Sequence, residues 1–146
     1  MNQLLLALLV SSSFVSFSYA ASSKTPAAKT EKNEGFALIH ADDLKKAMEN
    51  KEESVAIFDA NNDTTRKEEG VIPGAKTLNS VSKYDAKTIL PADKNAKLVF
   101  YCANTMCMAS HQAAKVAVAA GYKNVSVMAD GIQGWKKAGN PTEKFQ

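Results

Sequence analysis

The sequence predicts an α/β domain with a mainly parallel central sheet flanked by helices. Short apolar runs that suit buried strands alternate along the chain with patterns that suit helices. Such alternation is typical of domains in which helices cross between parallel strands. The part of the chain that carries these patterns, residues 36–146, has the size of one ordinary domain and contains no internal repeat.

The expected strands are short apolar runs at residues 36–39, 55–58, 98–101 and 125–128. Helical patterns follow three of these runs, at residues 42–50, 109–120 and 132–138. The first helix has acidic residues in its first turn, where the helix dipole favours them. Gly121 and Gly139 follow the other two helices, and glycine there can take the left-handed conformation that ends a helix.

The stretch between the second and third strands is harder to interpret. Residues 72–75 read Ile-Pro-Gly-Ala and predict a tight turn before a short strand, because Pro fixes φ and Gly permits a positive φ. Residues 77–97 have a weak pattern. We expect a short helix within residues 81–90 that Pro91 ends.

Residues 1–20 have the features of a secretory signal peptide. Their apolar run, residues 4–10, is far shorter than the roughly 20 residues that a membrane-spanning helix needs. Ser18 and Ala20 are small residues at the positions that a signal peptidase reads. We therefore expect a mature chain that begins after Ala20, in the periplasm or outside the cell and free of the membrane. A buried helix and a retained anchor are the alternatives, and no basic side chain precedes the apolar run.

Amino-acid composition and net charge support further expectations. Residues 21–35 are rich in Ala, Ser, Thr and Lys without an apolar period, and we expect a flexible leader there. The net charge is +3, from 18 Lys+Arg against 15 Asp+Glu, and the basic residues are scattered. A nucleic-acid-binding face needs clustered basic side chains with aromatic ones between them. We therefore expect no nucleic-acid partner, and we expect a monomer.

Both cysteines of the chain, Cys102 and Cys107, lie between an expected strand and an expected helix. Ligands of parallel sheets bind beyond the carboxyl ends of the strands, where the amides of the following helix point outward. If residues 103–108 curl around Cys102, their amides should stabilise an anion at its sulfur and lower the thiol pKa. Cys102 is then a nucleophile. The alternative is a small buried hydrophobic residue.

The second cysteine makes this loop unusual. The thiol of Cys107 could attack a persulfide or sulfenic acid on Cys102 and close a disulfide. A purely structural disulfide would gain little across so short a loop. A redox or sulfur-relay role and a passive role both stay open for Cys107. The other residues of the expected binding loop are Ala103, Asn104, Thr105, Met106 and Met108.

Four motifs, taken together and in this order, resemble a single rhodanese domain. They are Asp59 at the end of a strand, Gly-Val-Ile-Pro-Gly-Ala at residues 70–75, Tyr101-Cys102 before the loop, and Asp-Gly-Ile-Gln-Gly-Trp at residues 130–135. In rhodaneses the loop cysteine takes a sulfane sulfur from a donor, holds it as a persulfide and passes it to a thiophilic acceptor. The resemblance implies this role for Cys102, with thiols and persulfides of small molecules or proteins as partners and with no cofactor.

Several of these residues also have a local interpretation. Trp135 is expected in the core, and Gly131 and Gly134 should let the last helix begin close to its neighbours. Asp59 should hydrogen-bond backbone near the loop, or else be an exposed carboxylate. Arg66, the only arginine of the chain, is expected on the surface, from which it could swing toward a donor.

The chain departs from the rhodanese pattern where relatives that use thiosulfate carry positive charge. Ala103 and Cys107 occupy loop positions that are often Arg, Asn61 stands where Arg often follows the strand Asp, and Val71 replaces a usual His. Fixed charge for a dianionic donor is therefore missing, which makes thiosulfate a doubtful substrate.

Other chemistries fit the sequence less well. Phosphatases of a related fold need Arg six residues after the cysteine, where this chain has Met108. Cys102, Cys107 and His111 match no common zinc spacing, and we expect no metal. Three hypotheses follow from the loop. They are a sulfurtransferase that uses Cys102, a thiol-disulfide oxidoreductase that uses both cysteines, and a catalytically silent rhodanese module that binds a partner.

Overall fold

The computed structural model describes residues 34–146. The signal peptide expected at residues 1–20 and nearly all of the leader expected at residues 21–35 lie outside these residues and stay predictions. Within the described part, no helix has the length and apolar character that crossing a membrane requires.

The centre of the domain is a five-stranded sheet in the order β1-β5-β4-β2-β3. Every pair of neighbouring strands is parallel, which confirms the predicted fold class. In register, Asp59 of β2 pairs with Tyr101 of β4, and Tyr101 pairs with Met128 of β5, so three strands end at the same level. The strands are β1 (Ala37–Ile39), β2 (Val55–Asp59), β3 (Lys76–Thr77), β4 (Lys97–Tyr101) and β5 (Asn124–Met128).

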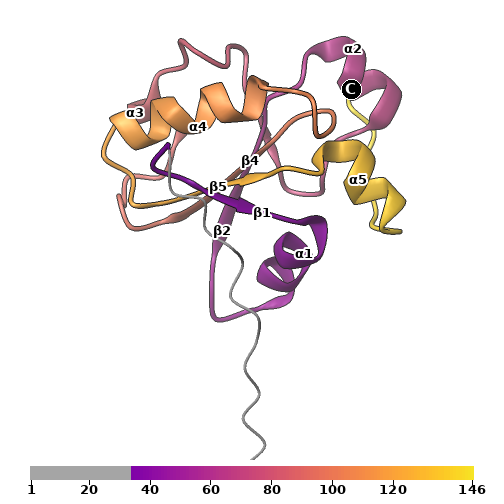
Figure 1. Ribbon diagram of the computed structural model, residues 1–146, viewed down its shortest axis with the longest axis horizontal. Helices are drawn as coiled ribbons and strands as arrows, with labels where there is room; N and C mark the ends of the chain where they lie inside the picture. Colours follow the sequence, from indigo (N-terminus) through magenta and orange to yellow (C-terminus); the bar gives the residue numbers. More distant parts are fainter. Residues whose placement is uncertain (1–33) are drawn as a thin grey trace, which may run out of the picture.

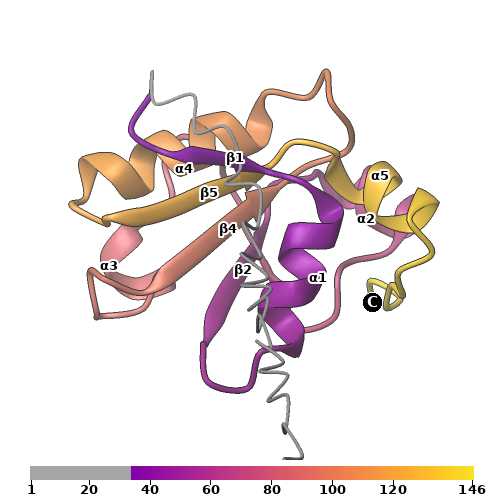
Figure 2. The ribbon, with the colours of Figure 1, turned by 60° about the horizontal axis from the view of Figure 1, so that its bottom comes forward.

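Helices cover both faces of this sheet (Figures 1 and 2). Helices α3 (Ala86–Ile89) and α4 (Ala109–Ala119) pack on one face, and α1 (Ala41–Glu49) and α5 (Gly131–Lys137) pack on the other. Helix α2 (Asp63–Glu69) lies near the C-terminus in both views. The three helices that the sequence predicts most clearly are therefore confirmed, with bounds that differ by at most one residue.

Two helical segments differ from the expectation. Helix α2 was not predicted, because its residues are polar on all sides and carry no apolar period. Its start is nevertheless capped, since the Asn62 side chain accepts a hydrogen bond from the Thr65 amide at 2.9 Å. Helix α3 occupies only the second half of residues 81–90, because Asp85 caps it by accepting from the Lys87 amide at 3.0 Å.

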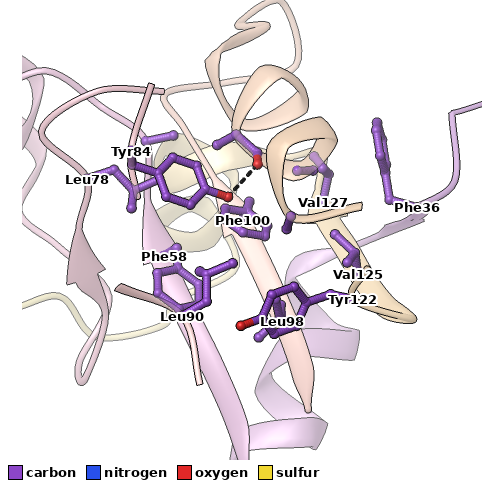
Figure 3. Close-up of a cluster of buried hydrophobic side chains, with 14 of the residues drawn as sticks. Phe36, Phe58, Leu78, Tyr84, Leu90, Leu98, Phe100, Tyr122, Val125 and Val127 are labelled. Atoms are coloured by element: carbon purple, nitrogen blue, oxygen red, sulfur yellow. Dashed lines mark hydrogen bonds between the residues drawn. The ribbon is translucent and has the colours of Figure 1, made fainter. Parts of the chain in front are cut away.

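The core has two halves, one on each face of the sheet. Alternate residues of β4 point to opposite faces, so Leu98 and Phe100 belong to one half, and Val99 and Tyr101 to the other. On the α4 face, Phe100 stacks on Phe58 with ring centroids 5.1 Å apart. Figure 3 shows the Tyr84 ring above this pair, its hydroxyl donating to the Ala113 carbonyl of α4 at 2.7 Å.

The opposite half of the core contains Trp135, as expected. Its side chain is buried between α5 and the sheet, and its Nε1 donates to the Pro141 carbonyl at 2.7 Å.

The predicted tight turn before β3 is confirmed as well. The Ala75 amide donates to the Ile72 carbonyl at 3.0 Å, and Gly74 has a φ of +77°.

Candidate functional site

The cysteine loop leaves the carboxyl end of the central strand β4 and leads into α4. Cys102 follows Tyr101, the last residue of the strand. Asn104 organises the loop, because its carbonyl accepts from the Cys107 amide and its side-chain oxygen accepts from the Met106 amide, both at 3.1 Å. The loop is therefore a compact turn held by its own hydrogen bonds.

Helix α5 supports the loop from the neighbouring strand end. The Ile132 amide donates to the Cys102 carbonyl at 2.8 Å, and the Gln133 amide donates to the Ala103 carbonyl at 3.0 Å. A Cβ atom on Gly131 would lie 2.5 Å from backbone atoms of Ala103, closer than side chains can approach. The predicted role of Gly131 is confirmed, because the bare glycine lets α5 begin directly against the loop.

The side chain of Cys102 is buried beneath this loop and is 1% exposed. Its thiol donates to the Cys107 carbonyl at 3.1 Å and lies 3.2 Å from the Ser110 hydroxyl. Burial, followed by the hydrogen bond with the Cys107 side chain, raises the pKa of Cys102 to about 11, and Ser110 only partly offsets this. The expected lowering of this pKa by loop amides is therefore wrong for this conformation. A carbonyl faces the sulfur, and burial disfavours the thiolate.

The second thiol is more accessible. Cys107 is half-buried, and neither cysteine forms a disulfide. Cys107 lines a pocket of about 550 Å³ between the loop, the start of α2 and the segment after β3. Cys102 is not among the lining residues, and none of those residues is charged. The polar part of the wall comes from Asn61, Asn62, Thr65, Asn79 and Ser80.

A buried polar network holds the strand ends below this pocket. The carboxylate of Asp59 is fully buried and accepts from the Tyr101 hydroxyl and from the Asn61 amide, each at 2.6 Å. Arg66 lies 3.4 Å from the same carboxylate and donates to the carbonyls of Asp59 and Leu78 at 3.1 and 2.9 Å. Since Tyr101 directly precedes Cys102, this network anchors the base of the loop.

The network corrects one expectation and decides another. Arg66 is only 3% exposed, so the expectation of a surface arginine that swings toward a donor is wrong. The sequence could not show this, because the buried partners of Arg66, Asp59 and the Leu78 carbonyl, lie outside its own helix. For Asp59, the predicted hydrogen bond with backbone near the loop is confirmed, and the alternative of an exposed carboxylate is wrong. Burial, followed by the charge of Asp59, also raises the pKa of the Tyr101 hydroxyl, which keeps Tyr101 a hydrogen-bond donor.

The two methionines of the loop do not pack inside the domain. Met106 is 89% exposed and Met108 is 53% exposed, and both border the turn that carries Cys107. Their exposure fits an apolar rim beside the site and does not fit packing in the core. In residues 34–146, no three His, Cys, Asp or Glu side chains are placed to hold a metal ion together.

Two functional candidates were missed by reasoning from the sequence. Ser110 is the second residue of α4, where a serine gives no signal of its own, yet it is 1% exposed and contacts the Cys102 sulfur. Asp130 belongs to the last of the four motifs, which indicated no separate role for its side chain. Its carboxylate accepts from the Ala41 amide at 2.9 Å and lies 3.1 Å from His40 Nδ1, which joins the start of α1 to the start of α5.

This contact predicts a pH dependence near the loop. The hydrogen bond with Asp130 raises the pKa of His40 above its ordinary value of 6.5. The contact should therefore stabilise the fold fully below about pH 6.5, and its contribution should disappear as the pH rises through the raised pKa. NMR titration should show the His40 pKa falling in Asp130→Asn and changing little in Asp42→Asn. An unchanged pKa in Asp130→Asn would contradict the assignment.

A parallel α/β domain whose central strand ends in a supported cysteine loop is the architecture of rhodanese-like proteins. Residues 40–138 match the rhodanese-like domain family over most of the chain, and the protein belongs to this family. No match was found among curated proteins.

Solved structures share this architecture. A rhodanese-like domain from Anabaena sp. is 26% identical, with a TM-score of 0.59 and coverage of 77% of this chain and 80% of that one. A Rhodopseudomonas palustris protein of unknown function, described as a possible tyrosine phosphatase, is 26% identical, with a TM-score of 0.61 and coverage of 76% and 87%. A Bacillus halodurans protein, 23% identical with a TM-score of 0.63 and coverage of 73% and 75%, is similar in fold.

Proposed function

We propose that the protein is a sulfurtransferase that holds sulfane sulfur as a persulfide on Cys102 and passes it to a thiophilic acceptor. The position of Cys102 carries this proposal, because the thiol directly follows the central strand of a rhodanese-like domain, at the edge where ligands of parallel sheets bind. The family membership and the pocket beside the loop support it. Phosphate-ester hydrolysis is less suited, since Met108 stands where such chemistry needs Arg.

The pocket favours persulfides over thiosulfate as sulfur donors. None of its lining residues is charged, and Arg66 is engaged in the buried network below it. A dianion would therefore meet only neutral dipoles, which serve neutral or singly charged donors almost as well. The donor class that we propose is a persulfide of a small molecule or of a protein cysteine.

Intact-mass analysis of the protein after incubation with glutathione persulfide tests this function. We expect one added sulfur atom, which cyanide removes as thiocyanate. In wild-type protein, alkylation and peptide mapping should place the stored sulfur on Cys102, because this thiol holds the persulfide. A wild-type protein that gains no sulfur, or that stores none on Cys102, would refute the proposal.

A thiol-disulfide oxidoreductase is a second candidate, because both thiols are free and the Cys102 thiol donates to the Cys107 carbonyl at 3.1 Å. In the same experiment, this activity predicts rapid loss of two hydrogens in place of a gained sulfur. A silent binding module predicts no change in mass.

The uncharged pocket also predicts how an added charge should act. Ala103→Arg should lower KM for thiosulfate about tenfold or more with little change in kcat, since a charged hydrogen bond is worth about 1.5–3 kcal/mol. Ala103→Gln, which lengthens the side chain without charge, is the matched control and should leave KM unchanged. If wild-type protein already uses thiosulfate efficiently and Ala103→Arg changes little, the pocket does not select by charge.

A further inference from the structure

The two thiols differ in access to the pocket. Cys102 belongs to the buried core on the α4 face and is 1% exposed. Cys107 is partly buried and lines the pocket together with Asn61 and Ala103. A donor that enters the pocket therefore contacts Cys107 before it reaches Cys102.

We propose that Cys107 is the first sulfur acceptor, which takes sulfane sulfur from the donor and hands it to Cys102 for storage. This inference rests on the proposed function and fixes the order in which the two thiols act. It reverses the role in which Cys107 would only attack a sulfur that Cys102 already carries.

The first step occurs in the pocket. The Cys107 thiolate attacks the outer sulfur of a donor persulfide, and a bond forms between Cys107 Sγ and that sulfur while the S–S bond of the donor breaks. The donor thiolate leaves with the bonding electron pair and takes up the proton that Cys107 released. The products are a Cys107 persulfide and a donor thiol, without net oxidation.

The second step occurs within the loop. The Cys102 thiolate attacks the outer sulfur of the Cys107 persulfide, and Cys107 leaves as a thiolate that receives the proton from Cys102. The geometry brings the partners together, since the Cys102 thiol already donates to the Cys107 carbonyl at 3.1 Å. Ser110, 3.2 Å from the Cys102 sulfur, is placed to hydrogen-bond the thiolate.

The same environment makes Cys102 a poor first acceptor and a good store. With a pKa of about 11, roughly one molecule in ten thousand carries the Cys102 thiolate at neutral pH. Its burial keeps small donors from approaching directly. Once sulfur is on Cys102, the same burial limits the access of oxidants in solution to the persulfide.

A matched pair of variants tests the order, with glutathione persulfide as the donor and alkylation followed by peptide mapping to locate the sulfur. Cys102→Ser should carry one sulfur on Cys107 and load at the wild-type rate. Cys107→Ser should load Cys102 at least about tenfold more slowly than wild type does. Equal loading rates in Cys107→Ser and wild type, or no sulfur on Cys107 in Cys102→Ser, would overturn the order.

Two further readouts separate this role from a structural one. In Cys107→Ser, the slow loading should rise about tenfold per pH unit below the Cys102 pKa, because only the thiolate attacks. In wild-type protein, which needs no variant to fold, early samples should contain sulfur on Cys107 before it accumulates on Cys102. Sulfur that appears first on Cys102 refutes the order but leaves the proposed function intact, whereas wild-type protein that takes no sulfur refutes both.

Discussion

Asp59→Ala is expected to lower the free energy of unfolding by about 3–5 kcal/mol, because it leaves the buried guanidinium of Arg66 without its charged partner inside the domain. Asp59 is fully buried and Arg66 is 3% exposed. The substitution also removes the acceptor of the Tyr101 hydroxyl. A loss of this size is a large part of the stability of a small domain.

The matched control is Asp63→Ala. Asp63 also binds Arg66, at 2.9 Å, but its side chain is 69% exposed, so its loss should cost less than about 1 kcal/mol. Urea unfolding of both variants at neutral pH measures the difference. Similar losses in the two variants would show that the buried contact is no stronger than the surface one.

Gly131→Ala is expected to cost about 2–5 kcal/mol and to slow sulfur loading. Gly131 has a φ of +63°, and this left-handed conformation costs residues other than Gly roughly 1–2 kcal/mol. The new Cβ would also meet the backbone of Ala103 at 2.5 Å, and overpacking costs typically about 1–3 kcal/mol more. Because Ala103 follows Cys102 directly, the loop has to shift.

Gly74→Ala separates the two causes. Gly74 has a similar φ of +77°, but nothing lies within 4 Å of its expected Cβ position. This variant should lose only about 1–2 kcal/mol and keep the wild-type rate of sulfur loading. If both variants lose the same stability and load sulfur equally well, the contact between α5 and the loop does not position the site.

Local patterns were sufficient for most of the fold. Apolar runs identified the strands β2, β4 and β5 within one residue, because buried strands of a parallel sheet are apolar on both faces. The helix α2 escaped this reasoning. It contributes no apolar stripe to the core, and it is placed by Arg66, whose partners Asp59 and Leu78 lie on other elements.

The sequence by itself determined that both cysteines belong to a loop at the carboxyl end of a strand, and that glycine lets the last helix begin close to its neighbours. These features follow from residue order and from the limited conformations of the backbone. Only the tertiary structure decided that Arg66 is buried, that Cys107 faces the pocket and that Cys102 has a raised pKa. Burial and pKa depend on which atoms surround a side chain, and elements far apart in the sequence supply those atoms.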